Sequence, residues 1–313
     1  MEDYTNFNRY KENGFVIIPG VLTPNELINA RSLIYSKTES MPSYKRMIVI
    51  SDILHDPDLI NLLINVQFNE KVVSVLENIF NKKINYVNDL QIQCNMFGSS
   101  LSGGGWHIDA GSEVGNQYLH APSYLFGKMG VYLQNNTLEF GGGIDVLPKT
   151  HKAFRFFNNH IIPQSLYIKF RHKLSMLTRR IAKLTVPIKA GDAVFFDSRL
   201  YHRSSPPTSV RVDSREVKRV SNAKIHHENS KYVLYWDAGT ERDARHFLRN
   251  SCKRAMLEEI VAVEDHQELF YTDYLRYSYP TDYPSLYKKA VDNLSSVEIL
   301  SLDTKKSELF KSL

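Results

Sequence analysis

The spacing of apolar residues along the chain changes in character near residue 86. Before that point, apolar residues recur at helical spacing, as in Leu76, Ile79 and Phe80, because positions three and four apart share one face of a helix. After it, short runs of β-branched and aromatic residues alternate with Gly, Asn and Pro. This pattern predicts a mostly helical part over 1–85 and a β-rich part over 86–240.

Two helix starts in the first part carry strong local signals. Thr23 followed by Pro24 and Glu26 has the spacing of a capping box with proline at the first helical position. Asp56 before Pro57 predicts a second helix N-terminus. The first part is therefore expected to be mostly helical, after an opening strand.

The predicted strands are short and are separated by turn-forming residues. They span 15–18, 90–97, 130–133, 144–147, 183–188, 192–196 and 232–236. Many short strands with turn residues between them indicate a sandwich or barrel, and a jelly roll is one such fold. We expect one domain over 1–313, with a jelly-roll core over 86–240, flanking helices (an α+β arrangement) and a helical, tyrosine-rich extension over 241–313.

Composition describes an ordinary globular protein, with 42% hydrophobic and 23% charged residues among 313. A net charge of +5 does not by itself indicate nucleic acid. Two cysteines fit a reducing compartment, and neither a secretory signal nor a long apolar run is visible. We expect a cytoplasmic monomer or homodimer that acts on a small-molecule substrate and binds neither nucleic acid nor membrane.

Candidate chemistry begins with the stretch Trp106-His107-Ile108-Asp109, which follows three glycines. On an extended strand, His107 and Asp109 point to the same face because side chains alternate with a period of two. His202 is the best candidate for a third ligand. Two histidines and one carboxylate, with other positions open, suit non-haem Fe(II) that activates oxygen. A single His-x-Asp pair is weak evidence, so its surroundings matter.

Four segments in chain order carry a resemblance to a known family. They are 13–23, the His-x-Asp stretch 106–109, the glycine-rich 139–152 with its Pro-x-Thr-His-Lys end, and 190–204 with its Gly-Asp start and His-x-Ser end. In these segments the chain resembles the phytanoyl-CoA dioxygenase family of Fe(II)- and 2-oxoglutarate-dependent oxygenases, over roughly residues 10–240. No one segment is decisive, but four in order are fairly specific.

The resemblance implies a double-stranded β-helix core, as in cupins, with Fe(II) held by His107, Asp109 and His202. It implies 2-oxoglutarate as cosubstrate, which is converted with O2 to succinate and carbon dioxide while the substrate is oxidised. Family members that halogenate usually have a small residue in place of the carboxylate. Asp109 therefore favours hydroxylation, or a related oxidation such as desaturation or ring closure.

The far carboxylate of 2-oxoglutarate requires a cation, which in the family is an arginine about ten residues after the distal histidine. Arg211 has nearly that spacing, whereas Lys231 begins the next clear strand; Arg215 is a further rival. Ser204 matches a family position that helps to bind the same carboxylate. Thr137 sits where a polar residue often lines the cosubstrate pocket, and a turn role suits it equally.

Candidates for the substrate pocket are fewer. Gln91, Gln93 and Asn95 share one face of a predicted strand. Trp106 is either a packing residue beside the iron or a substrate contact. The segments 110–128, 153–182 and 211–230 are expected to supply the lid and the substrate walls, because specificity resides mostly in loops.

Two other functions stay open at this point. One is a catalytically silent jelly-roll binding or regulatory protein, which the uncertain arginine favours. The other is a cupin-like metal enzyme that does not use 2-oxoglutarate. Those enzymes usually carry more histidines and a closer glutamate than this sequence offers.

Overall fold

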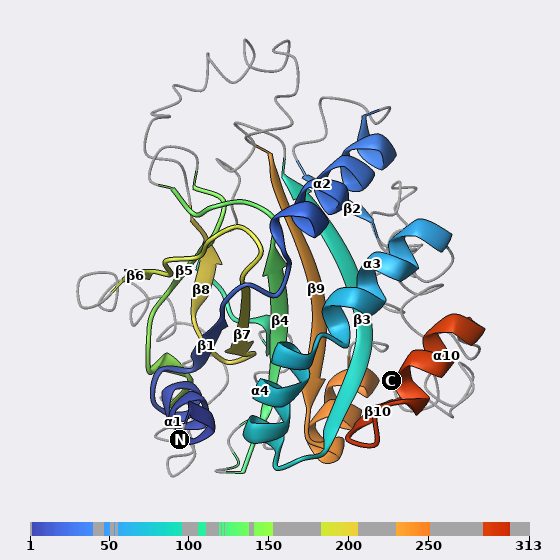
Figure 1. Cartoon of the computed structure of the whole chain (residues 1–313). Helices are drawn as coiled ribbons and strands as arrows, with labels where there is room; N and C mark the ends of the chain where they lie inside the picture. Colours follow the sequence, from blue (N-terminus) through green and yellow to red (C-terminus); the bar gives the residue numbers. More distant parts are fainter. Residues whose placement is uncertain are drawn as a thin grey trace, which may run out of the picture.

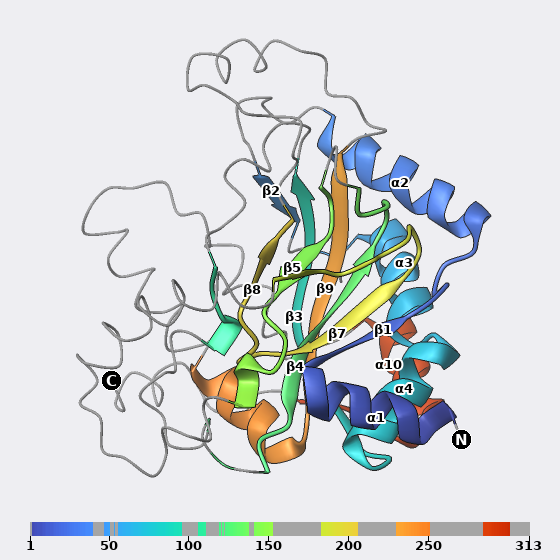
Figure 2. The same ribbon diagram turned by 90° about the vertical axis from the view of Figure 1, so that its left-hand side faces the viewer.

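The computed structural model describes residues 2–39, 47–50, 53, 56–95, 106–110, 119, 121, 123–137, 141–152, 183–205, 230–250 and 284–300. Within these residues, two β-sheets face each other (Figures 1 and 2). Helices cover the outer face of the larger sheet, which Figure 2 shows most clearly.

The larger sheet has seven described strands and the smaller sheet has three. The larger follows the order β1 (Phe15–Ile18), β7 (Ala193–Asp197), β4 (Phe126–Tyr132), β9 (Lys231–Gly239), β3 (Ile84–Asn95) and β10 (Val297–Ile299), and β2 (Met47–Ile50) also pairs with β3. The smaller follows β6 (Leu184–Thr185), β5 (Ile144–Val146) and β8 (His202–Ser204). Every described strand pair except β10–β3 is antiparallel. The predicted jelly roll, or double-stranded β-helix, with flanking helices is confirmed.

The described helices are α1 (Glu2–Asn13), α2 (Pro24–Thr38), α3 (Pro57–Gln67), α4 (Glu70–Phe80), a helical stretch over 241–250, and α10 (Ser285–Asp292). Of these, α2 and α3 begin at the residues that the sequence predicts. In the capping box of α2, the Thr23 backbone N–H donates to Glu26 Oε2 at 2.8 Å, and the Glu26 backbone N–H donates to Thr23 Oγ1 at 3.4 Å. The Asp56 side chain caps α3 by accepting from two backbone N–H groups. Each cap satisfies donors that have no partner inside the helix.

Successive side chains of β9 point alternately into two hydrophobic cores, one on each face of the larger sheet. Tyr232, Leu234 and Trp236 are buried on the face of the sheet that the helices cover. Val233 belongs to the cluster between the two sheets, and Tyr235 packs against that cluster. Side chains two apart share a face, so Lys231 and Asp237, at the ends of this series, also lie on the inner face. The interior of the jelly roll therefore receives both apolar and charged groups.

Some elements differ from the prediction. The helix α1 precedes the opening strand, although its sequence is largely polar. Among its described side chains only Tyr10 is buried, and its ring stacks on Phe195 with 5.2 Å between centroids. One buried residue gives no helical periodicity, so the pattern could not reveal this helix. The strands β2, β8 and β10, each of three or four residues, are also missing from the prediction.

The motif segments of the sequence dock on one another at the edge of the jelly roll. Gly191 has a φ of +89°, a conformation that favours glycine. Asp192 beside it accepts hydrogen bonds from the backbone N–H groups of Gly20 at 2.8 Å and Lys189 at 2.9 Å. These bonds fix β7 to the turn before α2.

A second contact joins the first motif to the third. Gly14 has a φ of +85°, and a Cβ there would lie 2.5 Å from Nδ1 of His151. This buried histidine packs closely on the glycine and so joins the segment 139–152 to the segment 13–23.

No single helix in the described part of the chain is long and apolar enough to cross a bilayer. Among the described helices, only α3 and α4 taken together are long and apolar enough, and this pair is bent by 54°. Their apolar side chains, such as Leu63, Val66 and Leu76, are buried in the protein core.

Of the tyrosine-rich extension, the structure describes Tyr287. Its hydroxyl donates to Gln67 Oε1 at 2.6 Å, and its ring centroid lies 5.4 Å from that of Phe68. This tyrosine therefore packs in the core. Tyr271, Tyr274, Tyr277, Tyr279 and Tyr283 lie outside the described residues.

A buried ion pair ends β7. Arg199 donates from Nε to Asp197 Oδ1 at 2.9 Å and from Nη2 to Asp197 Oδ2 at 2.7 Å, and its Nη1 donates to the Leu119 carbonyl at 3.1 Å. The side chains of the pair are 1% and 2% exposed. The guanidinium also lies over the Tyr124 ring, 4.3 Å from its centroid. This pair shapes the turn that leads into β8.

We expect Arg199→Met to lower the free energy of unfolding by about 3–5 kcal/mol, because the change leaves Asp197 buried without its cation. Urea unfolding followed by circular dichroism measures the loss. Arg245→Met is the matched control. Its pair with Glu241 is about half exposed, so its removal should cost less than about 1 kcal/mol. Equal losses for the two variants would contradict a structural role for the buried pair.

Candidate metal centre

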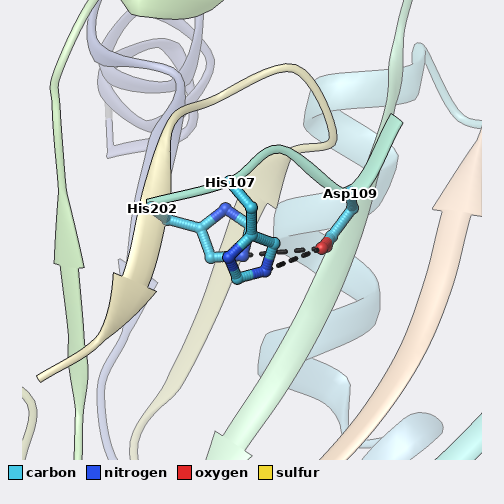
Figure 3. A group of neighbouring side chains, drawn as sticks. All are labelled: His107, Asp109 and His202. Atoms are coloured by element: carbon cyan, nitrogen blue, oxygen red, sulfur yellow. Dashed lines mark ion pairs between the residues drawn. The ribbon is translucent and has the colours of Figure 1, made fainter. Parts of the chain in front are cut away.

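Three side chains that the sequence marks as ligands converge on one point between the sheets (Figure 3). They are His107, Asp109 and His202, and their ligand atoms all lie within 4.8 Å of one another. Oδ1 of Asp109 lies 3.7 Å from Nε2 of His107 and 3.5 Å from Nε2 of His202. Such distances between neighbouring ligand atoms fit a common metal ion with bonds near 2 Å.

Backbone pairing sets this geometry. His107 and His202 form an isolated antiparallel bridge, with N–H to O distances of 3.0 and 2.9 Å. The N–H of Ala110 donates to the Ser198 carbonyl at 3.0 Å. Asp109 and Ala110 form a tight helical turn, whereas the prediction placed the pair on a continuous strand. The bridge at one end and the bond at the other bring Asp109 to the histidines despite that difference.

The surroundings of His202 fix the orientation of its ring and its protonation state. Its Nδ1 lies 3.0 Å from the Leu200 carbonyl, and a hydrogen bond there places the ring proton on Nδ1 and leaves the Nε2 lone pair available. Burial lowers the pKa of His202 to about 4, so the ring is neutral at pH 7. His107 is different, because 47% of its side chain is exposed. The centre therefore opens to solvent on the side of His107.

We expect His202 of the metal-free protein to remain neutral at pH 5, because protonation would place a charge in a desolvated site. Its folded-state pKa of about 4 lies below the ordinary value of 6.5. The unfolded chain therefore binds more protons between these values, and the free energy of unfolding falls by about 2 kcal/mol between pH 7 and pH 5. Ring nitrogen shifts in an NMR titration identify the protonation state. Titration of His202 near pH 6.5 would contradict this account.

A buried cation lies on the same inner face. Lys231 is 5% exposed at the start of β9, and its Nζ donates to Ser204 Oγ at 3.0 Å and to the Gly143 carbonyl at 3.2 Å. Burial lowers the pKa of Lys231 to about 8. Ser204 follows His202 by two residues on β8, so both side chains point inward, about 7 Å apart along the strand.

Sequence reasoning missed a second inward-pointing cation. Lys128 on β4 lies opposite Asp237 on β9 in the sheet register. Its Nζ lies 3.9 Å from Oδ2 of Asp237 and 3.9 Å from Oδ2 of Asp109. The sequence signal for this cation was a single charged residue inside a strand that is otherwise apolar. The register that joins it to the metal centre was not readable from sequence.

The structure also places predicted pocket residues on the inner face. Gln91 lies opposite Tyr235 and Gln93 opposite Val233 in the register between β3 and β9, and paired residues share a face. Asn95 pairs with Lys231 along the backbone, but its side chain is outside the described part. The expectation that these strand positions face the interior agrees with this register.

Other predicted site residues lie elsewhere. The Trp106 ring packs on the Arg203 guanidinium, 4.9 Å from its Cζ, and Arg203 points away from the inner face because it alternates with His202. Thr137 is exposed in a turn that pairs it with Gly141. Arg211 and Arg215 lie outside the described residues, as do the greater parts of the predicted lid segments.

The donor set determines which chemistry the centre could support. Two imidazole nitrogens and one carboxylate oxygen could hold a divalent first-row metal and leave positions open for other ligands. The depressed pKa of His202 and its fixed ring proton suit this use. The residues present therefore fit a non-haem iron site.

Comparisons with known proteins agree with the fold. The sequence model of the phytanoyl-CoA dioxygenase (PhyH) family matches residues 10–217. No curated protein matches the sequence.

Several solved structures resemble the chain weakly. The epimerase SnoN from nogalamycin biosynthesis shares 14% identity over 76% of this chain and 82% of its own, with a TM-score of 0.49. EctD from S. alaskensis with bound Fe shares 13% over 75% of each chain, with a TM-score of 0.47. HygX from Streptomyces hygroscopicus with nickel, 2-oxoglutarate and hygromycin B shares 14% over 76% of this chain and 87% of its own, with a TM-score of 0.48.

These structural likenesses assign no substrate or reaction to the chain, because their identities and TM-scores are too low. The family match is different, since it spans more than half of the sequence and includes both histidines and the aspartate of the metal centre. It also covers the motif segments that dock on one another at the edge of the jelly roll. The chain belongs to the phytanoyl-CoA dioxygenase family.

Proposed function

We propose that the chain is an Fe(II)- and 2-oxoglutarate-dependent oxygenase that hydroxylates a small organic molecule, with release of succinate and carbon dioxide. The observation that carries this proposal is the convergence of His107, Asp109 and His202 on the inner face of the jelly roll. Family membership supports the same reaction class. A reaction of this kind needs a metal with open positions, a site for the cosubstrate and a protected interior.

The three ligands would hold Fe(II) through two imidazole nitrogens and one carboxylate oxygen. Bound iron with 2-oxoglutarate supplies the oxidising chemistry, which belongs to the metal and the cosubstrate. The protein contributes a neutral His202 whose ring is fixed by the Leu200 carbonyl. The ring of Phe196 packs against His202, with 4.7 Å between centroids. This packing limits rotation of the ligand and excludes water from its buried side.

Lys231 is the residue that we propose to anchor the far carboxylate of 2-oxoglutarate, together with Ser204. Its position at the start of β9 and its bond to Ser204 Oγ at 3.0 Å support this role. A desolvated ammonium gives up little water when it binds an anion, and a charge-assisted hydrogen bond is strong in such a setting. Spacing in the sequence slightly favoured Arg211, which lies outside the described residues and is tested beside Lys231 below.

Aromatic side chains would form the wall between this anchor and the metal. The Tyr132 ring centroid lies 5.7 Å from Lys231 Nζ, and Tyr132 and Tyr235 meet edge to face at 6.5 Å. Gly130 makes room for Tyr235, since a Cβ there would lie 2.7 Å from that ring. In this proposal the two tyrosine rings would lie along the cosubstrate between Lys231 and the metal ligands.

Asp109 supports hydroxylation as the outcome. A carboxylate ligand occupies the metal position that halide takes in halogenating family members. The substrate itself would approach from the side of His107, where the centre is exposed. Gln91 and Gln93 on β3 offer amide groups near that interior and are the residues that we propose to contact it.

Succinate production tests the proposal. Purified protein with Fe(II), O2, ascorbate and 2-oxoglutarate should release succinate slowly without substrate, and Asp109→Ala should abolish the release. Absence of succinate from a wild-type protein that binds iron and 2-oxoglutarate would favour a catalytically silent binding protein. Iron binding without any affinity for 2-oxoglutarate would favour a metal enzyme of another class.

A further inference from the structure

The two oxygens of the Asp109 carboxylate face different partners. Oδ1 lies 3.7 and 3.5 Å from Nε2 of His107 and His202, on the side where the three ligands converge. Oδ2 lies 3.9 Å from Nζ of Lys128. The same carboxylate therefore offers one oxygen to the metal centre and the other to a lysine.

We propose that Lys128 is a positioning residue that keeps Asp109 bound to the metal through one oxygen only. The inference rests on the proposed function, because it concerns a metal held by the same three residues. Carboxylates bind metals through one oxygen or through both. A cation beside Oδ2 competes with the metal for that oxygen and leaves Oδ1 as the ligand.

Asp237 holds Lys128 in this position. The two residues are direct partners in the β4–β9 register, and Oδ2 of Asp237 lies 3.9 Å from Nζ. The lysine side chain is 15% exposed and the Asp237 side chain 1%. A charge this deeply buried is stable only with a partner. Lys128 therefore stands between two carboxylates, one structural and one that binds the metal.

The Tyr235 ring limits where the ammonium can go. Nζ of Lys128 lies 6.0 Å from the centroid of this ring, which itself packs against the β4 backbone at Gly130. The Lys128 ammonium therefore lies near Asp237 in the sheet and near the Tyr235 ring, and Asp109 is its partner on the side of the metal centre.

One-oxygen binding has a chemical consequence. If each of the three protein ligands gave one atom to the metal, more of its positions would stay open to the cosubstrate and O2. Two-oxygen binding by Asp109 would occupy one of them. Lys128 thus acts on the binding of the cosubstrate through Asp109, without contact to either reactant.

Co(II) as a colour probe tests the inference before any cosubstrate is added. In Lys128→Met, the visible spectrum of bound Co(II) should change from that of the wild type, because the number of oxygen ligands changes. Co(II) affinity should be equal or higher, since a repelling cation is removed. Affinity for 2-oxoglutarate, measured anaerobically with Fe(II), should fall about tenfold. Lys128→Arg keeps the charge and should restore both properties.

The double variant Lys128→Met/Asp237→Asn separates positioning from folding, because it removes both charges of the buried pair. If Lys128 serves only the fold, this variant should regain the wild-type Co(II) spectrum and 2-oxoglutarate affinity. If Lys128 positions Asp109, the double variant should fold and keep both defects. Lys83→Met is the matched control, since its ammonium is exposed and forms pairs elsewhere; it should change neither property.

The outcomes distinguish this inference from the proposed function. A wild-type protein that binds neither Co(II) nor 2-oxoglutarate overturns the function and the inference with it. A wild-type protein that binds both, with an unchanged Co(II) spectrum in Lys128→Met, overturns the inference alone. A loss of Co(II) affinity in Lys128→Met with unchanged 2-oxoglutarate affinity overturns it as well.

Discussion

Replacing His107 by alanine should weaken metal binding by at least about 100-fold while leaving the fold intact. The loss follows because one of three protein ligands is removed, and even residues that only support a ligand typically contribute 10–100-fold. The fold should survive because 47% of the His107 side chain is exposed and exposed substitutions rarely change stability by more than about 0.5 kcal/mol. Calorimetric titration with Co(II) and urea unfolding of the metal-free protein measure the two effects.

His107 is a better test than the other two ligands. His202 is buried against Phe196, so its removal would leave a cavity and destabilise the fold. Weaker metal binding in that variant could then result from unfolding and not from the loss of a ligand. His246→Ala is the comparison, because this histidine lies on the helical stretch over 241–250 and is not one of the three converging side chains. Unchanged metal affinity in His107→Ala would exclude the convergent group as the metal site.

Replacing Lys231 by methionine should weaken 2-oxoglutarate binding by about 100-fold and stabilise the metal-free protein. Truncating one partner of a buried charge pair typically costs 2–5 kcal/mol of binding. Stability should change in the opposite direction, because burial lowers the pKa of Lys231 to about 8, below its ordinary value of 10.5. The unfolded chain therefore holds the proton more tightly, and Met should raise the free energy of unfolding at pH 7 by on the order of 1–3 kcal/mol.

The pH dependence sharpens this prediction. In the wild type, affinity for 2-oxoglutarate should decline above pH 8, because the free protein then loses the charge on Lys231. Lys231→Arg should bind the cosubstrate without that decline, since a guanidinium keeps its proton. Arg211→Met and Arg215→Met serve as comparisons. If Arg211→Met abolishes binding and Lys231→Met does not, Arg211 is the anchor.

Opposite effects on stability and binding would identify Lys231 as a functional residue. Functional sites often carry groups that the fold alone would reject. A buried lysine beside the Gly143 carbonyl and Ser204 adds little to the core of a jelly roll, which packs better with apolar side chains. Binding of the 2-oxoglutarate carboxylate, as proposed, would explain why a lysine stands at the start of β9.

The fold was readable from sequence where local signals were strong. Thr23 and Asp56 begin the helices as predicted, because the capping interactions involve residues that are neighbours in the chain. The strand around Val194 was found because a short run of apolar residues, Ala193 to Phe196, follows the Gly191-Asp192 turn. The three residues that converge in the candidate metal centre were picked out from the sequence because motif residues keep a fixed order along the chain.

Contacts between distant segments could not be read in the same way. Lys128 and Asp237 are 109 residues apart in the chain and meet only through the β4–β9 register, which no local pattern specifies. Asp109 was expected on a strand and instead starts a turn, because Ala110 bonds to Ser198 in another segment. The position of Lys231 beside Ser204 likewise depends on how the sheet that contains β9 packs on the sheet that contains β8.

The most direct test of the proposed function is an anaerobic titration of the Fe(II) protein with 2-oxoglutarate. Chelation of iron by the keto acid produces a weak visible charge-transfer band. The proposal predicts that this band appears in the wild type, vanishes in His107→Ala and requires much more 2-oxoglutarate in Lys231→Met. A wild-type protein that binds Fe(II) and shows no band at saturating 2-oxoglutarate would contradict it.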